Sequence, residues 1–225
     1  MALSKSGKNP RNKMNAKQND FAKNVFINCP LDDAYIPLLR PLIFTVLYLG
    51  YTPRIATERS DSGETRINKI CGLIEKSRLS IHDLSRICSA KQKEFYRMNM
   101  PFELGMDIGC RFFKGGLASE KKFLVLEEEK YRYQKAFSDL SGFDIKSHEN
   151  DPETLVCQVR NWFVENEIQH ADSGTKIWEN FNEFMTNFYE KREDEGFKDR
   201  DLEIMPTPEF IRFIQEWLKK KQIKA

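Results

Sequence analysis

The sequence predicts an α/β fold, in which a doubly wound parallel sheet of about five strands is followed by a C-terminal helical extension. Three observations predict it. Short apolar runs alternate with segments of helical period between Asn24 and Ile168, which is typical of strands joined by helical crossovers. Polar residues gather where several of these runs end, as they do at the ligand-binding edge of an open sheet. After Gly174 the alternation stops, and aromatic residues recur at helical spacing.

Three regions follow from this pattern. The central α/β domain is expected to be preceded by a flexible basic arm and followed by helices. The expected boundaries are 1–20, 21–170 and 171–225. The basic arm is interpreted as a solvated segment, and the alternative is that it grips an acidic partner.

The strands are expected where apolar and β-branched residues form short runs bounded by polar residues, proline or glycine. They span 24–30, 52–58, 79–83, 122–127 and 143–146. The run 122–127 carries the strongest strand signal, and 143–146 the weakest. Strands in this arrangement pair in parallel through right-handed crossovers.

The helices are expected at 35–51, 66–77, 101–113, 152–168, 175–192 and from 207 onwards. Asp32 and Asp33 offer an N-cap for the first helix, Gly50 is placed to end it, and Pro41 is expected to kink it or to delay its regular part. Thr207 is the expected N-cap of the last helix.

Composition limits the class of protein. The 225 residues carry a net charge of +2, from 36 basic and 34 acidic side chains, which argues against general affinity for nucleic acid. Five scattered cysteines without a C-x-x-C pair favour reduced thiols in a cytoplasmic protein, and the three histidines are too far apart in sequence for a structural metal site. No apolar run reaches the ~20 residues of a membrane span, and the first residues lack the apolar core of a signal peptide.

The segment from Leu79 to Arg86 is predicted to be the centre of a functional site. It reads as a buried strand that ends in His82, Asp83, Ser85 and Arg86, at the edge where open sheets bind ligands. After a polar stretch, Pro101 is expected to open a helix and to place Glu103 in its first turn. Gly105 and Gly109 are expected to let one face of this helix approach the sheet closely.

Two further loops should meet at the same edge. They offer hydroxyls, small residues, carboxylates and arginines, which suit a sugar and a phosphate. The residues predicted to bind substrate are Asn28, Pro30, Ser62, Gly63, Arg66, His82, Ser85, Arg86, Asn99 and Met100. For His82 the alternative is a buried, hydrogen-bonded side chain, and for Arg66 and Arg86 it is a surface ion pair.

The segments 81–85 and 100–109, Ile-His-Asp-Leu-Ser and Met-Pro-Phe-Glu-Leu-Gly-Met-Asp-Ile-Gly, resemble those of the nucleoside 2-deoxyribosyltransferase-like family. That family carries an Asp after its third strand and a Glu-x-Gly-x-Ala motif on the next helix. The wider group resembles TIR domains, which have a flavodoxin-like sheet and many of which cleave NAD with a Glu on the corresponding helix. The resemblance covers roughly residues 23–168.

The resemblance implies that Glu103 is the catalytic carboxylate and that Asp83 helps to orient the sugar or base. Asp107 and Gly109 stand where the family often has small residues, which is a departure from its pattern. It also implies a nucleotide, nucleoside or NAD as substrate, no resident cofactor, and cleavage of an N-glycosidic bond, often in bacterial antiviral defence. A carboxylate can stabilise the positive charge that this cleavage builds on the sugar.

Two alternatives stay open at this point. One is a nucleotide-sensing module that keeps the pocket without turnover, with Glu103 complementing the positive end of its helix and Asp83 capping the next segment. The other is a protein-interaction scaffold. It would use the C-terminal stripe formed by Trp178, Phe181, Phe184 and Phe188, which we expect to bury against the sheet domain or against a second copy of the chain.

Overall fold

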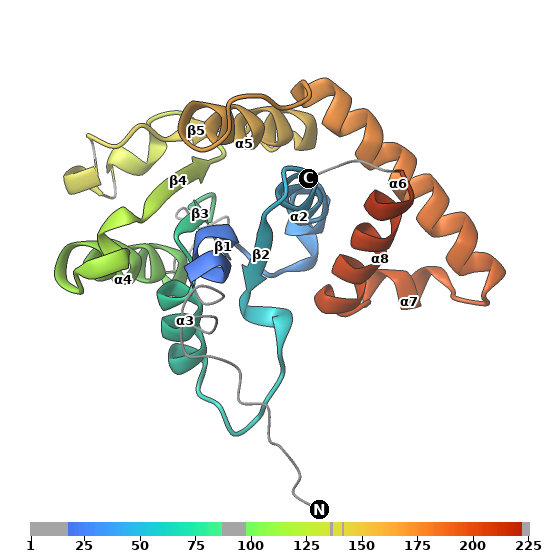
Figure 1. Ribbon diagram of the computed structural model, residues 1–225, viewed down its shortest axis with the longest axis horizontal. Helices are drawn as coiled ribbons and strands as arrows, with labels where there is room; N and C mark the ends of the chain where they lie inside the picture. The colour runs from blue at the N-terminus through green and yellow to red at the C-terminus, as the bar shows by residue number, and fades with distance from the viewer. Residues whose placement is uncertain (1–17, 87–97, 136, 141, 222–225) are drawn as a thin grey trace, which may run out of the picture.

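The computed structural model describes residues 18–86, 98–135, 137–140 and 142–221 (Figure 1). Most of the predicted basic arm therefore lies outside the described residues. The described chain begins with a short helix over 18–23 that leads directly into the first strand.

A five-stranded, wholly parallel sheet forms the centre of the molecule, and this confirms the predicted fold class. The strands lie in the order β2-β1-β3-β4-β5. Their bounds are Asn24–Asn28 (β1), Thr52–Ile55 (β2), Leu79–Asp83 (β3), Lys122–Glu127 (β4) and Lys146–Ser147 (β5). In the register of β1 and β3, Asn28 lies beside His82, so the polar ends of these two neighbouring strands are brought together.

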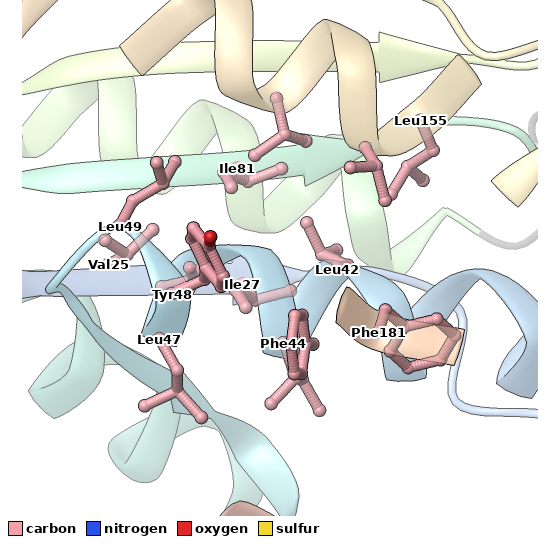
Figure 2. Packing of buried hydrophobic residues seen from close by; sticks show 14 of the residues in the cluster. Val25, Ile27, Leu42, Phe44, Leu47, Tyr48, Leu49, Ile81, Leu155 and Phe181 are labelled. Atoms are coloured by element: carbon pink, nitrogen blue, oxygen red, sulfur yellow. The ribbon is translucent and has the colours of Figure 1, made fainter. Parts of the chain in front are cut away.

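Helices cover both faces of the sheet. The helices α2 (Ile36–Tyr48) and α5 (Pro152–Asn166) pack on one face, where Val25, Ile27 and Ile81 point into an apolar core (Figure 2). The helices α3 (Arg66–Glu75) and α4 (Asn99–Phe113) cover the other face (Figure 1). This second face carries smaller apolar clusters and leaves room between them for buried polar side chains.

The C-terminal helices form a third layer outside α2. These are α6 (Gly174–Asp194), α7 (Asp199–Glu203) and α8 (Thr207–Lys220). The rings of Phe181, Phe184 and Trp217 surround Phe44 of α2 at centroid distances of 5.5, 5.7 and 5.9 Å. In the predicted aromatic stripe, Phe181, Phe184 and Phe188 are thus buried within the chain, and Trp178 is partly buried.

Several boundaries differ from those predicted. The strand expected over 52–58 becomes a short 3₁₀ helix after Ile55, and the weak fifth strand is reduced to two residues at the sheet edge. The helix α2 has no side-chain cap from Asp32 or Asp33, because a 3₁₀ turn precedes it, and it continues through Pro41. The 3₁₀ segments are η1 (Asp33–Tyr35), η2 (Ala56–Glu58), η3 (Gly116–Glu120), η4 (Arg132–Lys135) and η5 (Ser138–Leu140).

Two differences concern helix starts. The helix α4 begins at Asn99, so Pro101 stands at its third position, where its missing N–H still lacks an intrahelical acceptor. Glu103 therefore lies in the second turn rather than the first, where the field of the helix end has weakened. At α8, Pro206 is the N-cap and Thr207 is already helical.

The expected role of Gly105 and Gly109 is also wrong. A Cβ atom built on Gly105 would have no other atom within 4 Å, and one on Gly109 would meet Phe113 of the same helix at 3.8 Å. Both glycines therefore face away from the sheet. Close packing of α4 on the sheet instead uses Met100, Leu104 and Met106.

Candidate functional site

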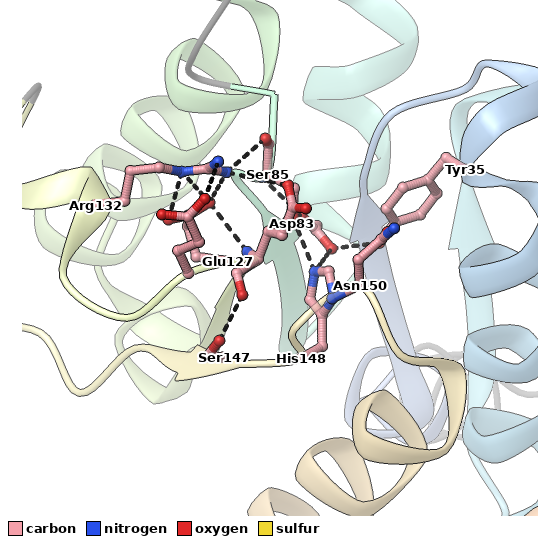
Figure 3. Close-up of polar contacts among 10 residues, drawn as sticks. Tyr35, Asp83, Ser85, Glu127, Arg132, Ser147, His148 and Asn150 are labelled. Atoms are coloured by element: carbon pink, nitrogen blue, oxygen red, sulfur yellow. Dashed lines mark hydrogen bonds and ion pairs between the residues drawn. The ribbon is translucent and has the colours of Figure 1, made fainter. Parts of the chain in front are cut away.

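Asp83, at the end of β3, is fully buried and is held by hydrogen bonds from several directions (Figure 3). The backbone N–H of Ser85 donates to its Oδ1 at 2.8 Å, and the Ser85 hydroxyl donates to the same oxygen. Its Oδ2 accepts from the Tyr35 hydroxyl of η1 and lies 3.1 Å from Nε2 of His148. Burial alone would raise the pKa of Asp83, but the His148, Ser85 and Tyr35 contacts outweigh it and hold this pKa below its usual value.

The cluster of Asp83, Ser85 and His148 contains the residue types of a hydrolytic triad, but its hydrogen bonds do not have that arrangement. The backbone N–H of Asn150 donates to Nδ1 of His148 at 3.1 Å, so the ring proton lies on Nε2. That same nitrogen faces both Asp83 and the Ser85 hydroxyl, which is 2.9 Å away. His148 therefore has no free nitrogen to remove a proton from Ser85, and the cluster fixes a loop.

A second buried network lies on the opposite face of β3. His82 is fully buried, and its Nε2 is 3.1 Å from Oδ2 of Asp107 on α4, which also accepts from the Ser80 hydroxyl at 2.5 Å. Lys121 lies 3.0 Å from the other Asp107 oxygen and donates to the carbonyls of Ile74 and Ser77. Burial would raise the pKa of Asp107, but the His82, Lys121 and Ser80 contacts lower it overall.

Asn28 joins this network to the start of α4. Its amide nitrogen lies 3.0 Å from Nδ1 of His82 and donates to the carbonyl of Met100 at 2.9 Å. Since the amide uses both of its N–H groups, Nδ1 of His82 is the acceptor of one of them, and Nε2 is the nitrogen directed at Asp107. The ends of β1 and β3 thus position the first turn of α4, which leads to Glu103.

Glu103 differs from these carboxylates in having few partners. Its side chain is 6% exposed. Within the described part of the chain it has one ion pair, 3.3 Å from the guanidinium of Arg66 on α3, whose side chain is half-exposed. Burial raises the pKa of Glu103, and the charge and hydrogen bond of Arg66 only partly oppose this shift. A carboxylate that is poorly solvated and weakly paired interacts strongly with a positive charge that forms beside it.

The other predicted binding residues are arranged around this edge. Met100 contributes a backbone carbonyl to the network, Asn99 is exposed at the start of α4, and Pro30 is buried after β1. Arg86 pairs with Asp32 at 3.7 Å, which ties the loop after β3 to the loop after β1. Ser62 and Gly63 lie in an exposed turn, and among the described residues no hydrogen bond or ion pair joins them to Glu103 or Asp83.

Sequence reasoning missed five residues of these networks: Tyr35, Ser80, Asp107, Lys121 and His148. His148 directly follows β5, so the rule that polar residues at strand ends share one edge could have found it. Asp107 lies one turn after Glu103, on the same side of α4. We find no sequence signal for Lys121 or Tyr35, because each becomes part of a network only when distant elements pack together.

Comparisons of this chain with protein-family models, curated proteins and solved structures found no match. Within the described segments, there is no group of three or more His, Cys, Asp or Glu side chains that could hold a metal ion. None of the helices described is both long and apolar enough to cross a membrane.

Proposed function

We propose that this protein cleaves the N-glycosidic bond of a nucleotide, a nucleoside or NAD, with Glu103 as the catalytic carboxylate. The observation that carries the proposal is the state of Glu103, which is nearly buried, has a raised pKa and, among the described residues, is paired only with a half-exposed arginine. It lies beside the sheet edge where parallel folds bind ligands. The resemblance to the nucleoside 2-deoxyribosyltransferase-like and TIR-like families supports the same residue.

In this reaction the bond between the anomeric carbon and the base nitrogen breaks, and its electron pair leaves with the base. The sugar ring becomes cationic, and Glu103 stabilises that charge or bonds to the anomeric carbon. Water then supplies the oxygen that bonds to this carbon, and its proton goes to solvent or to the departing base. Arg66 reaches the same carboxylate from a half-exposed position, where its remaining N–H groups can bind a phosphate of the substrate.

The role of Asp83 in this proposal is indirect. Both of its oxygens are engaged by Tyr35, Ser85 and His148, so it supports the loop after β3 rather than binding sugar hydroxyls. We therefore treat Asp83 as a positioning residue and Glu103 as the catalytic one.

The test measures the release of free base from NAD and from a panel of purine and pyrimidine nucleosides, with liquid chromatography as the detection method. The Glu103→Gln variant should lose at least ~10²-fold in turnover, the low end for a positioned acid–base group. Its affinity for substrate should change far less, because the lost interaction is strongest in the transition state. Glu75→Gln, on the exposed side of α3, is the matched control and should keep full turnover.

Unchanged base release by a folded Glu103→Gln protein would exclude Glu103 as the catalytic group. The second candidate function is a nucleotide-sensing module, which the full engagement of Asp83 favours, because only one of the two predicted carboxylates can then meet a ligand. Binding of NAD or a nucleotide by the unmodified protein, without any release of base, would support the sensing module instead.

A further inference from the structure

The surface of α4 that faces away from the sheet is apolar and exposed. Phe102, Phe112 and Phe113 are 60%, 70% and 90% exposed, and Met98, one turn before Phe102, is exposed as well. The helix lies on the opposite side of the molecule from α6, α7 and α8 (Figure 1). The C-terminal aromatic stripe is already buried within the chain, so this surface is a separate one.

Two glycines occupy the same face of the helix. Gly105 and Gly109 fall between Phe102 and Phe112 at spacings of three and four residues, so all four lie along one side of α4. Space around the Gly105 Cβ position is open, so close packing within the chain does not require a glycine there. Glycine in a helix interior is destabilising, and here it leaves a shallow strip between two exposed rings.

Four positions of this face are arranged symmetrically along the helix, whereas the exposed Phe113 and Met98 lie outside the symmetric set. Phe102 and Gly105 precede Asp107 by the distances at which Phe112 and Gly109 follow it. If two α4 helices cross in antiparallel directions around this midpoint, the glycines meet at the centre and Phe102 of one copy lies opposite Phe112 of the other. A two-fold interface needs such a self-complementary surface, whereas binding of an unrelated partner does not require the symmetry.

We propose that the exposed face of α4 is a homodimer interface in which two copies of this chain pair antiparallel about a two-fold axis that passes between Gly105 and Gly109. Asp107, at the same level along the helix, is buried on the opposite side. The glycines let the two helix backbones approach closely, and the phenylalanines cover the strip on both sides. From position 102 to 112 the contact spans ~15 Å along each helix.

The first test measures the dimer dissociation constant of the full chain by sedimentation equilibrium. Phe112→Asp places a charge in the contact, and Gly105→Leu fills the crossing point without a clash inside the subunit. Each should raise the dissociation constant at least ~30-fold, the effect of losing a central contact. Ile204→Asp is the matched control, since Ile204 is as exposed as Phe112 but lies at the end of α7, and it should leave the constant unchanged.

The second test fixes the direction of pairing. Chains carrying Phe102→Cys are mixed with chains carrying Phe112→Cys and treated with diamide as the oxidant, and the disulfide-linked peptides are identified by mass spectrometry. The mixture should give a link between positions 102 and 112, which each variant alone should lack. The unmodified chain controls for disulfides formed by its own cysteines.

Three outcomes would overturn the proposal. The first is a chain that stays monomeric at ~50 µM. The second is a dimer that tolerates Phe112→Asp and Gly105→Leu, which would place the interface elsewhere. The third is a monomer that binds phosphatidylcholine–phosphatidylserine vesicles and loses this binding with Phe112→Asp, which would make the face a lipid contact.

Discussion

Replacement of Glu103 by glutamine should remove activity without costing stability. Burial raises the pKa of Glu103 in the folded state above its unfolded value, so the folded protein holds the Glu103 proton more tightly. The contribution of this group to folding is therefore most favourable below the unfolded pKa, ~4.3, and it declines as pH rises through the folded pKa. At pH 7 the buried charge opposes folding, and a neutral glutamine avoids that cost.

The comparison is with Glu167→Gln. Glu167 has the same side-chain type and 5% exposure against 6% for Glu103, but it pairs with Arg78 and lies 3.0 Å from Lys122. Burial raises its pKa, but these two cations outweigh burial and lower it overall, so its charge favours folding at pH 7. Glu167→Gln should cost ~1–3 kcal/mol, the range for a hydrogen bond to a charged group.

For Glu103→Gln we expect the free energy of unfolding to stay the same or to rise. The substitution loses the ion pair with half-exposed Arg66, but such a pair contributes only ~0–1 kcal/mol. The measurement is urea denaturation at pH 7 and at pH 4, where the advantage of Glu103→Gln should shrink. A loss at pH 7 as large as that of Glu167→Gln would refute the reasoning, since it would mean that the Glu103 charge is well stabilised in the fold.

Three further predictions concern positions at which the structure leaves little tolerance for substitution. His148→Ala removes a donor to buried Asp83 and should lower the free energy of unfolding by at least ~2 kcal/mol, measured by urea denaturation. Gly174→Ala would place a Cβ atom 2.4 Å from Sγ and 3.0 Å from Cα of Cys157, so crowding should cost ~1–3 kcal/mol and lower the Tm in calorimetry. Phe184→Ala empties the space between α2 and α8 and should cost ~3–5 kcal/mol, with release of the C-terminal helices seen as faster hydrogen exchange.

Two of these predictions have a control variant that should not lose stability, and the third has a partner variant, Asp83→Asn, that should lose it. Gly72→Ala, inside α3 with no atom within 4 Å of the new Cβ, should stabilise the protein by ~0.5–1 kcal/mol. Ile204→Ala shortens an apolar side chain that is 70% exposed, outside the face of α4, and should change stability by less than ~0.5 kcal/mol. An unaltered protein on Asp83→Asn would show that the His148 contact carries no stability.

The strand–helix alternation was enough to predict the sheet, because burial on both faces demands continuous apolar runs and the crossovers demand helices. The runs 79–83 and 122–127 coincide with β3 and β4. The predicted aromatic stripe is buried for a similar reason, since the periodicity of α6 alone reveals which side is apolar. In each of these cases the signal lies within one segment and does not depend on its neighbours.

Other features needed the tertiary structure. The orientation of Gly105 and Gly109 was mispredicted, because small size is compatible both with close packing on the sheet and with an exposed strip. Whether the glycines face the sheet or the solvent depends on the orientation of α4 about its own axis. Two contacts set this orientation. Asn28 of β1 donates to the carbonyl of Met100 at the start of α4, and His82 of β3 contacts Asp107 in the middle of the helix.

The sequence by itself determined that Asp83 and Glu103 stand near one sheet edge, because strand ends and the following helix start must lie there. Only the tertiary structure decided that the two carboxylates differ in their hydrogen-bond partners and in the direction of their pKa shifts. Asp83 receives Tyr35 and His148 from segments 48 residues before it and 65 residues after it. Of the residues that the structure describes, Arg66 is the one that forms an ion pair with Glu103, and burial keeps the pKa of Glu103 raised. Solvation and pairing depend on residues that are distant in sequence, and these set the properties of a carboxylate more strongly than its place in the chain does.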